Sequence, residues 1–340
     1  MEIESVIFIR RDNIGDLVCT TPAIRAVRRA FPRAKIGVLV NSYNAPVLRG
    51  NTDIDRLYVY QKPKHLPGKS RLAVLWGNFK VFQEIRREGY DAAIAGGSYS
   101  KTLARFTFLT GAKKRVGYGK KDLYLNMAVD EGVAGHEAIK TFRLLEPFGI
   151  TGEPGGLVLA IDEAERKRYE ALIRPARKAK RPVVAVAISA RIKRNRWPLE
   201  KFIGLIEGIT GNGAADVLLV WAPGSKDNPM FSGDEESART IKDRFGDRIM
   251  AFDTPSISSL IAALSCSDIV VTLDTGSLHI SAALGKATVA LMTKPKALCW
   301  YPWKTKSRVI TADPDVKDIA VEDVFGAVKD FIDEHGKGRD

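Results

Sequence analysis

The chain has 340 residues, 45% of them hydrophobic, which suits two globular domains of about 150 residues each, and the lack of any apolar run of about 18 residues excludes a membrane-spanning helix. Three cysteines without paired spacing or a nearby histidine cluster argue against disulfides and a zinc site, and the acidic start of the chain is the reverse of a signal peptide, so we expect a cytoplasmic protein. The net charge of +13, from 53 Lys and Arg against 40 Asp and Glu, favours anionic partners, whereas sparse aromatic residues among the basic clusters argue against nucleic acid.

In the first half of the chain, short β-branched runs alternate with amphipathic stretches. The apolar runs predict strands near residues 5–10, 35–40, 56–60, 91–95 and 114–117. The amphipathic stretches predict helices near residues 16–31, 72–88, 99–110 and 135–148. This βαβ order predicts a parallel sheet with right-handed crossovers.

The second half repeats the plan after a Gly/Pro-rich stretch near residue 150. A charged helix near 162–179 comes first, and strands are then predicted near 183–188, 216–221, 268–273 and 287–292. Helices are predicted near 198–210, 235–245, 256–265, 276–284 and 320–335. The economical fold is an α/β protein with two doubly wound domains that face each other across a cleft, with ligands at the carboxyl ends of the strands.

The expected division of the chain follows from these patterns. We expect an N-terminal domain over 1–155, a linker with a helix over 156–180 and a C-terminal domain over 181–318. A last helix within 319–340 is expected to pack back on the N-terminal domain.

The first candidate site is the turn RRDNIGD, residues 10–16, which joins the first strand to the first helix. Asn13 and Gly15 supply the turn, and Asp16 lies in the first helical turn, where the helix dipole favours a negative charge by about 0.3 to 1 kcal/mol. Asp16 can therefore be a helix cap and nothing more. Its place at the carboxyl end of a strand also fits a general base for a sugar hydroxyl, which is help worth roughly 10²- to 10⁴-fold.

The matching stretch in the second half is DTGSLH, residues 274–279, which follows an apolar strand. Thr275 and Gly276 begin a small-residue helix whose unpaired N–H groups offer an anion site suited to a pyrophosphate. His279 lies one turn further on and would point the same way. A buried structural histidine is the alternative.

A third stretch, ARIKRNRWP, residues 190–198, carries four cations in the loop after another strand. Its Trp-Pro pair opens the next helix with Pro at the first position. Four like charges in so short a loop repel one another unless an anion lies among them. Lys193, Arg194 and Arg196 are therefore candidate phosphate contacts, with a solvated loop as the alternative.

Two further motifs resemble ligand sites without meeting their requirements. GGSYSKT, residues 96–102, lacks the Gly before Lys that a P-loop needs. DID, residues 53–55, is similar to the metal-binding motif of some glycosyltransferases but is typical of a turn that leads into the strand at 56–60. No metal, kinase or protease signature remains.

Through most of its length the sequence resembles the heptosyltransferase family of bacterial lipopolysaccharide synthesis, glycosyltransferase family 9. The stretches that carry the resemblance are RRDNIGDLVCTTPAIRAVRRAFPRAKIGVLV, RWPLEKF and DTGSLHISAALGKATVAL. The resemblance implies a GT-B fold, with an acceptor domain first and a nucleotide-sugar domain second. It implies inverting transfer of a heptose, usually from ADP-L-glycero-β-D-manno-heptose, to the inner core without a required metal or other cofactor.

The resemblance also implies roles for particular residues. Asp16 matches the catalytic base, with Asn13 and Gly15 on the acceptor side. The residues that match the family's binding site for the donor's diphosphate and nucleotide are Ser189, Asp274, Thr275, Gly276 and His279. The chain departs from the family pattern by having Asn195 in place of a Lys, Ser225 in place of the ribose-binding Glu, and Thr293 in place of a Gly. The phosphate contact of the missing Lys can then come from Lys193, Arg194 or Arg196.

The implied partners are a nucleotide-sugar donor and an anionic glycolipid acceptor, with weak peripheral association with the inner leaflet. Two other functions fit the same architecture. A sugar-nucleotide epimerase would keep the donor site and use no acceptor. A non-catalytic nucleotide or carbohydrate binder would use Asp16 only as a helix cap.

Overall fold

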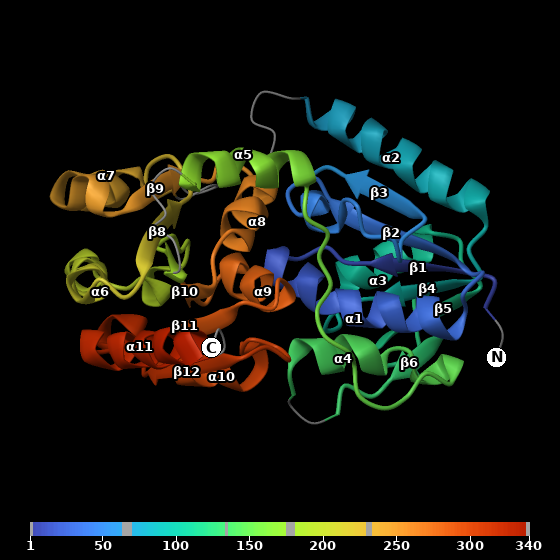
Figure 1. Cartoon of the computed structure of the whole chain (residues 1–340). Coiled ribbons are helices and arrows are strands. Elements are labelled where there is room, and N and C mark those ends of the chain that lie inside the picture. Colours follow the sequence, from blue (N-terminus) through green and yellow to red (C-terminus); the bar gives the residue numbers. More distant parts are fainter. Residues whose placement is uncertain (1–2, 63–69, 133–134, 175–180, 229–232, 338–340) are drawn as a thin grey trace. The chain divides into compact units, whose positions relative to one another are not determined.

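The computed structural model describes the chain except residues 1–2, 63–69, 133–134, 175–180, 229–232 and 338–340. The chain divides into two compact units, residues 1–160 and 161–340. Each unit contains one six-stranded sheet of parallel strands with helices packed around it (Figure 1). Within the described residues no helix is long and apolar enough to cross a membrane.

The first unit builds its sheet in the order β3-β2-β1-β4-β5-β6. Its inner strands are nearly continuous apolar runs because helices cover a parallel sheet on its faces. The elements are β1 (Ser5–Ile9), α1 (Ile14–Ala30), β2 (Lys35–Asn41), β3 (Arg56–Tyr60), α2 (Arg71–Glu88), β4 (Ala92–Ala95), α3 (Lys101–Leu109), β5 (Lys114–Tyr118), β6 (Met127–Val129) and α4 (Glu137–Arg143).

The second unit repeats the architecture with the order β12-β11-β10-β7-β8-β9. Its core lies between the sheet and the helices α6, α7 and α11. The elements are α5 (Glu163–Ile173), β7 (Val183–Ala187), α6 (Leu199–Asn212), β8 (Asp216–Trp221), α7 (Glu235–Phe245), β9 (Met250–Asp253), α8 (Ile257–Ser265), β10 (Ile269–Leu273), α9 (Gly276–Ala283), β11 (Ala287–Thr293), α10 (Lys294–Trp300), β12 (Ser307–Ala312) and α11 (Val321–Lys337).

The last helix, α11, uses its apolar face inside the second unit. Val324, Val328 and Phe331 are buried in the same cluster as Leu205 and Ile209 of α6. Its expected packing on the N-terminal domain stays a prediction. The end of the predicted helix at 162–179 lies partly outside the described residues.

The predicted strands and helices are present with shifts of a few residues, but some elements were missed. The sequence did not predict the short strands β6, β9 and β12 or the seven-residue helix α10. The helix predicted over 135–148 is shorter, because α4 ends at Arg143 and Pro147 cannot continue an α-helical hydrogen-bond ladder. The DID motif serves the turn as expected: Asp53 and Asp55 pair with Arg25 and Arg28 of α1 at 2.8 and 2.6 Å.

Both sheets follow the same winding. In each unit the first strand lies beside the fourth, β1 beside β4 and β7 beside β10, and the chain winds outward in both directions from that pair. The carboxyl ends of such a pair form a topological switch point, where open α/β sheets bind ligands. The candidate residues lie around these two switch points.

Candidate functional site

The switch point of the first unit centres on a buried guanidinium. Arg10 follows β1 directly and is 1% exposed. Its Nη2 donates to Oδ1 of Asp16 at 2.8 Å and to Oε1 of Glu137 at 2.7 Å, and its Nε lies 3.5 Å from Oδ2 of Asp12. Burial acts to lower the pKa of Arg10, but the carboxylates of Asp16, Glu137 and Asp12 overcome it and raise the pKa further above its usual value. Arg10 is thus a fixed positive charge that holds three acids around one point.

Asp16 is both a helix cap and a partly exposed carboxylate. Its Oδ2 accepts the backbone N–H of Asn13 at 3.0 Å, which anchors the first turn of α1, while Oδ1 accepts from Arg10. The side chain keeps 16% of its surface exposed. The two interpretations of Asp16 are therefore compatible, because capping fixes the carboxylate without closing it off from solvent.

The turn that carries Asp16 is tied down from two other elements. The side-chain amide of Asn41, at the end of β2, donates to the carbonyl oxygens of Arg11 and Asp12, each at 3.1 Å. Asn44 donates to the Asp12 carbonyl at 3.2 Å, and Lys62 donates to the Arg11 carbonyl at 2.6 Å. These bonds hold the backbone before α1, so Asn13 and Gly15 present Asp16 in one geometry.

The glycine pair after β4 belongs to this switch point. Gly97 has φ +130°, and a Cβ there would lie 3.1 Å from Nη1 of Arg10 and 3.3 Å from Oδ2 of Asp12. A larger residue would thus disturb both the backbone and the acids. Burial raises the pKa of Asp12, while Arg10 opposes that shift. The GGSYSKT stretch, which is no P-loop, therefore contributes close backbone packing beside Asp16's partners.

The switch point of the second unit is organised by an amide and an acid. Asn195 is 2% exposed, and its Nδ2 donates to the backbone oxygen of Asp274 at 3.0 Å and to its Oδ2 at 3.1 Å. Burial raises the pKa of Asp274, opposed by the charge of Lys296, the bond from Asn195 and the charge of Arg194. Asn195 is thus buried and orients Asp274.

The helix α9 begins directly after Asp274. Thr275 is its N-cap residue, and its hydroxyl is 2.7 Å from Oγ of Ser277, which is itself 2.6 Å from Oγ1 of Thr272. Gly276 leaves the first turn without a side chain over its N–H groups. His279 is 3% exposed, and its ring packs edge-on to Trp300 with centroids 5.7 Å apart. The structure therefore gives His279 the buried position that was the alternative in the sequence.

The cations of the loop after β7 have different positions. Arg196 donates from Nε to the Ala190 carbonyl at 2.8 Å and from Nη2 to the Lys226 carbonyl at 3.4 Å, so it ties two loops together. Lys193 is exposed. Ser189 accepts the backbone N–H of Ala222 at 2.9 Å. Among the candidate phosphate contacts, Arg194 lines a pocket.

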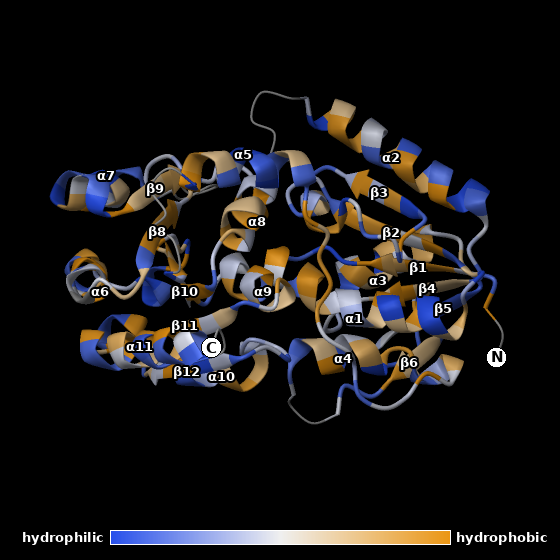
Figure 2. Cartoon of the chain, viewed as in Figure 1, coloured by the Kyte–Doolittle hydropathy of each residue, from blue (hydrophilic) through white to orange (hydrophobic). Residues whose placement is uncertain are grey.

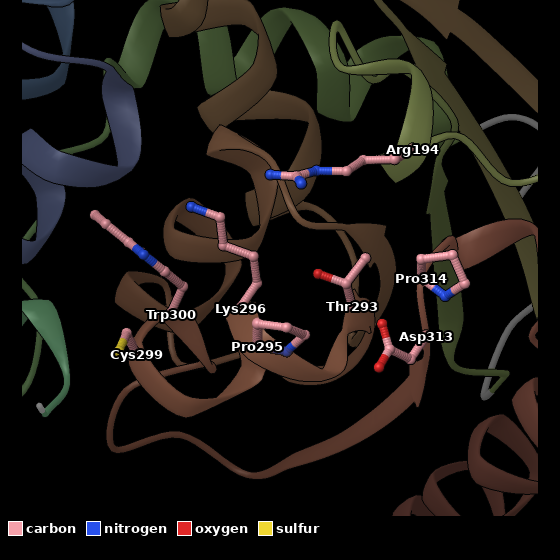
Figure 3. Close-up of a pocket in the computed structure, with 8 residues that line it drawn as sticks. All are labelled: Arg194, Thr293, Pro295, Lys296, Cys299, Trp300, Asp313 and Pro314. Atoms are coloured by element: carbon pink, nitrogen blue, oxygen red, sulfur yellow. The ribbon is translucent and has the colours of Figure 1, made fainter.

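This pocket has a volume of about 350 Å³ and lies at the carboxyl ends of β11 and β12 (Figure 3). Figure 3 shows the side chains of Arg194 and Lys296 extending into the same region, above Thr293. Both cations act on Asp274, which places the pocket's positive charge beside the start of α9. The lining residues are Arg194, Thr293, Pro295, Lys296, Cys299, Trp300, Asp313 and Pro314.

Two residues that line the pocket, Lys296 and Trp300, were not identified from the sequence because α10 was not predicted. The signal was present as two lysines that follow the end of β11 in TKPKALCW. Within the described residues, no group of three or more His, Cys, Asp or Glu side chains is arranged to hold a metal ion.

Comparison with known proteins decides the family. The model of "Glycosyltransferase family 9 (heptosyltransferase)" matches residues 78–327. The chain belongs to glycosyltransferase family 9. Among curated proteins it is similar to lipopolysaccharide heptosyltransferase 3 of Escherichia coli, with 22% identity over 295 residues that cover 85% of this chain and 83% of that protein.

Solved structures of the family share the fold. A glycosyl transferase family 9 protein of Veillonella parvula has a TM-score of 0.84 at 19% identity, covering 98% of this chain and 99% of that one. The Escherichia coli heptosyltransferase WaaC with ADP has a TM-score of 0.74 at 17% identity, covering 97% and 99%. The predicted α/β fold of two Rossmann-like parallel-sheet domains is thereby confirmed.

Family membership confirms that the chain is a glycosyltransferase, and it favours this class over the epimerase and the non-catalytic binder. The roles assigned to single residues are not tested by these likenesses and stay predictions. They are Asp16, Asn13 and Gly15 in the first unit, and Ser189, Lys193, Arg194, Arg196, Asp274, Thr275, Gly276 and His279 in the second.

Proposed function

We propose that this family 9 glycosyltransferase moves a heptose from an ADP-linked donor to a sugar hydroxyl of an anionic lipopolysaccharide core, with inversion of the anomeric centre. The donor is supported by the similarity to WaaC, which was solved with ADP and with ADP-2-deoxy-2-fluoro heptose. The acceptor is supported by the similarity to lipopolysaccharide heptosyltransferase 3. The proposal places the enzyme in the cytoplasm, against the inner leaflet.

The observation that carries the proposal is the setting of Asp16. Its carboxylate sits at the switch point of the first sheet, fixed through Arg10 and the Asn13 N–H, and still has 16% of its surface open. A general base needs this combination, because it must be oriented and must reach the hydroxyl whose proton it takes.

The proposed transfer is a single displacement at the anomeric carbon. The acceptor hydroxyl gives its proton to Asp16, its oxygen forms the new bond to the anomeric carbon, and the bond from that carbon to the diphosphate oxygen breaks. The bonding electrons leave with the nucleotide diphosphate. Arg10 stays charged throughout and acts on the reaction only by positioning Asp16.

The leaving diphosphate needs positive charge and N–H donors. In this chain we assign that task to Arg194 and Lys296 together with the first turn of α9 at Thr275 and Gly276. These two cations take the part that the family gives to the Lys at the position of Asn195. With them the charge is neutralised in this scheme without a metal ion or another cofactor.

Turnover of an Asp16→Ala variant tests the base. We expect kcat to fall roughly 10²- to 10⁴-fold while ADP binding, followed by calorimetry, stays unchanged. Asp12→Asn is the matched comparison, since Asp12 faces the same guanidinium from the same turn. Full activity in Asp16→Ala, or a larger loss in Asp12→Asn, would remove the assignment.

The donor is tested separately by calorimetric titration with ADP, GDP and UDP. Preference for ADP supports the proposal, and preference for UDP contradicts the heptose donor. Screening of nucleotide sugars with the preferred base then identifies the transferred sugar, and truncated core oligosaccharides identify the acceptor.

A further inference from the structure

The helix α2 carries large apolar side chains on its outer surface. Leu72 is 77% exposed, Leu75 and Trp76 are each 59% exposed, and Phe79 is 49% exposed. Their spacing of three and four residues puts them on one face of the helix, hereafter the apolar stripe. Figure 2 shows hydrophobic residues along α2. The solvent-facing side of a surface helix ordinarily carries polar residues.

The apolar stripe is not the face that packs on the sheet. The helix is held to the first unit by Val74, Phe82 and Ile85, which are buried. Phe82 and Ile85 belong to the core cluster beneath α2. On a helical wheel Val74 and Ile85 lie well away from the stripe and Phe82 lies at its edge. The helix α2 is therefore apolar on two faces, and only one of them packs inside the fold.

Positive charge accompanies the stripe. The ammonium of Lys80 lies 5.6 Å from the ring centre of Trp76, and the Trp76 ring stacks on Phe79 with centroids 5.5 Å apart. Arg87 is exposed two turns further along. The whole first unit is basic as well, with 25 Lys and Arg against 15 Asp and Glu in residues 1–160, compared with 28 against 25 in residues 161–340.

We infer that α2 docks the enzyme on an anionic phospholipid surface, lying in the plane of the interface with the apolar stripe among the upper acyl chains. A Trp and a Phe between leucines, next to lysine and arginine, is the composition of helices that bind at this depth. Basic residues near the surface add attraction to anionic lipid. A second copy of the chain is the weaker candidate, since pairing two stripes would bring two strongly basic units together.

This inference deepens the proposed function, because an enzyme with a lipid-linked acceptor gains from being held at the membrane. Its test needs no substrate and so can fail independently of the transferase activity. Purified full-length protein is mixed with vesicles of phosphatidylcholine, with and without phosphatidylglycerol, and separated by sedimentation. We expect binding to the anionic vesicles that weakens with added salt.

Trp76 is the one tryptophan of residues 1–160, and the difference in emission between the parent and Trp76→Phe isolates its signal. We expect its emission to shift to the blue on vesicle binding and to be quenched by brominated acyl chains. In Trp76→Phe the vesicle binding should remain while this signal is lost. An emission that stays unchanged on bound protein would show that another surface makes the contact.

The variants separate the stripe from general adhesion. We expect the triple variant Leu72→Ser/Leu75→Ser/Phe79→Ser to lower partitioning into vesicles by roughly tenfold or more, because it removes apolar surface that would be buried in the membrane. Leu123→Ser is the matched control, at a residue 70% exposed in the same unit. Lys80→Glu/Arg87→Glu should lower binding by about tenfold or more on anionic vesicles, and Lys329→Glu, on α11, should not.

Several results would overturn the inference. One is equal binding of the triple variant and the parent protein. Another is the absence of binding to anionic vesicles. A third is a concentration-dependent dimer, measured by light scattering, that the triple variant abolishes, since it would assign the stripe to a second copy of the chain.

Discussion

The switch points of the two units occupy the same place in the same strand order, but they carry different charges. The first surrounds a buried arginine with three carboxylates. The second places one half-buried carboxyl, Asp274, beside an amide, the hydroxyls at the start of α9 and two cations at a pocket. One doubly wound topology therefore provides the location in both cases, and the side chains after its first and fourth strands decide the chemistry.

The difference also concerns rigidity. In the first unit Asp16 and Glu137 both accept from Arg10 inside the protein, and this arrangement fixes Asp16. In the second unit the cations Arg194 and Lys296 extend into a pocket, where they can meet an anion from outside. We therefore expect substitutions of Arg10 to cost stability and substitutions of the pocket cations Arg194 and Lys296 to cost affinity.

The largest effect is expected for Arg10→Met. It leaves the carboxylates of Asp16 and Glu137 without their buried partner, and loss of one member of a buried ion pair typically costs about 3–5 kcal/mol. Chemical unfolding of the full-length variant and parent measures it. Arg194→Met is the comparison in the second unit, and its effect on the free energy of unfolding should be small because Arg194 is exposed. Similar losses in both variants would break the contrast.

The next effect concerns affinity. Lys296→Ala should weaken ADP binding by about 10- to 100-fold, since a hydrogen bond to a charged group contributes about 1.5–3 kcal/mol. Lys294→Ala is the matched control, because Lys294 starts the same helix, is exposed and does not line the pocket. Calorimetry measures both, and an equal loss in the control would reduce the role of Lys296 to general positive charge.

A smaller effect is expected for Asn195→Ala. The variant loses both donations to Asp274, each worth about 0.5–1.5 kcal/mol, and leaves the half-buried carboxyl without its amide partner. Thermal unfolding followed by calorimetry measures the loss. Asn195→Asp should be less stable still near neutral pH, because it places two acids in contact. If Asn195→Asp were as stable as the parent near neutral pH, the carboxyl groups at positions 195 and 274 would not repel one another as ions.

The sequence was sufficient to locate the residues that lie next to a strand end. Asp274 follows an apolar run directly and Asp16 follows one after the turn at residues 10–15, so the parallel order of the strands places both at the carboxyl edge of a sheet. The four missed elements have weaker patterns. The strands β6, β9 and β12 lie at sheet edges and keep partly exposed side chains, so they lack the continuous apolar run of a central strand.

The partners of the site residues could not be predicted from spacing. Glu137 bonds to Arg10 from 127 residues further along the chain, and nothing in its local sequence distinguishes it from the acids that serve a helix start. Asn195 likewise reaches Asp274 across 79 residues. Such pairs depend on which strand ends the fold brings together, and that is set by the winding of the whole sheet.

The smallest expected effect is a pH dependence of stability that differs between the two switch points. Burial raises the pKa of Asp274 above its ordinary value of 3.8, so over the pH range just above that value the folded protein holds a proton that the unfolded chain has released. The stability that this group provides is therefore complete below its ordinary pKa and is lost as the pH rises through the raised pKa. Asp274→Asn cannot ionise but keeps an oxygen that can accept from Asn195.

The free energy of unfolding of Asp274→Asn, relative to the parent, should thus increase as the pH rises from about 4 and then level off. Thermal melts at a series of pH values measure this difference. Asp12→Asn in the first unit should show the same sign, because burial raises the pKa of Asp12 as well, but the variant also gives up a partner of Arg10. A higher free energy of unfolding in Asp274→Asn, together with a lower one in Asp12→Asn, would demonstrate that the carboxylates of the first switch point stabilise the protein through their pairing with Arg10. A fall in the relative stability of Asp274→Asn with rising pH would contradict the direction assigned to the pKa of Asp274.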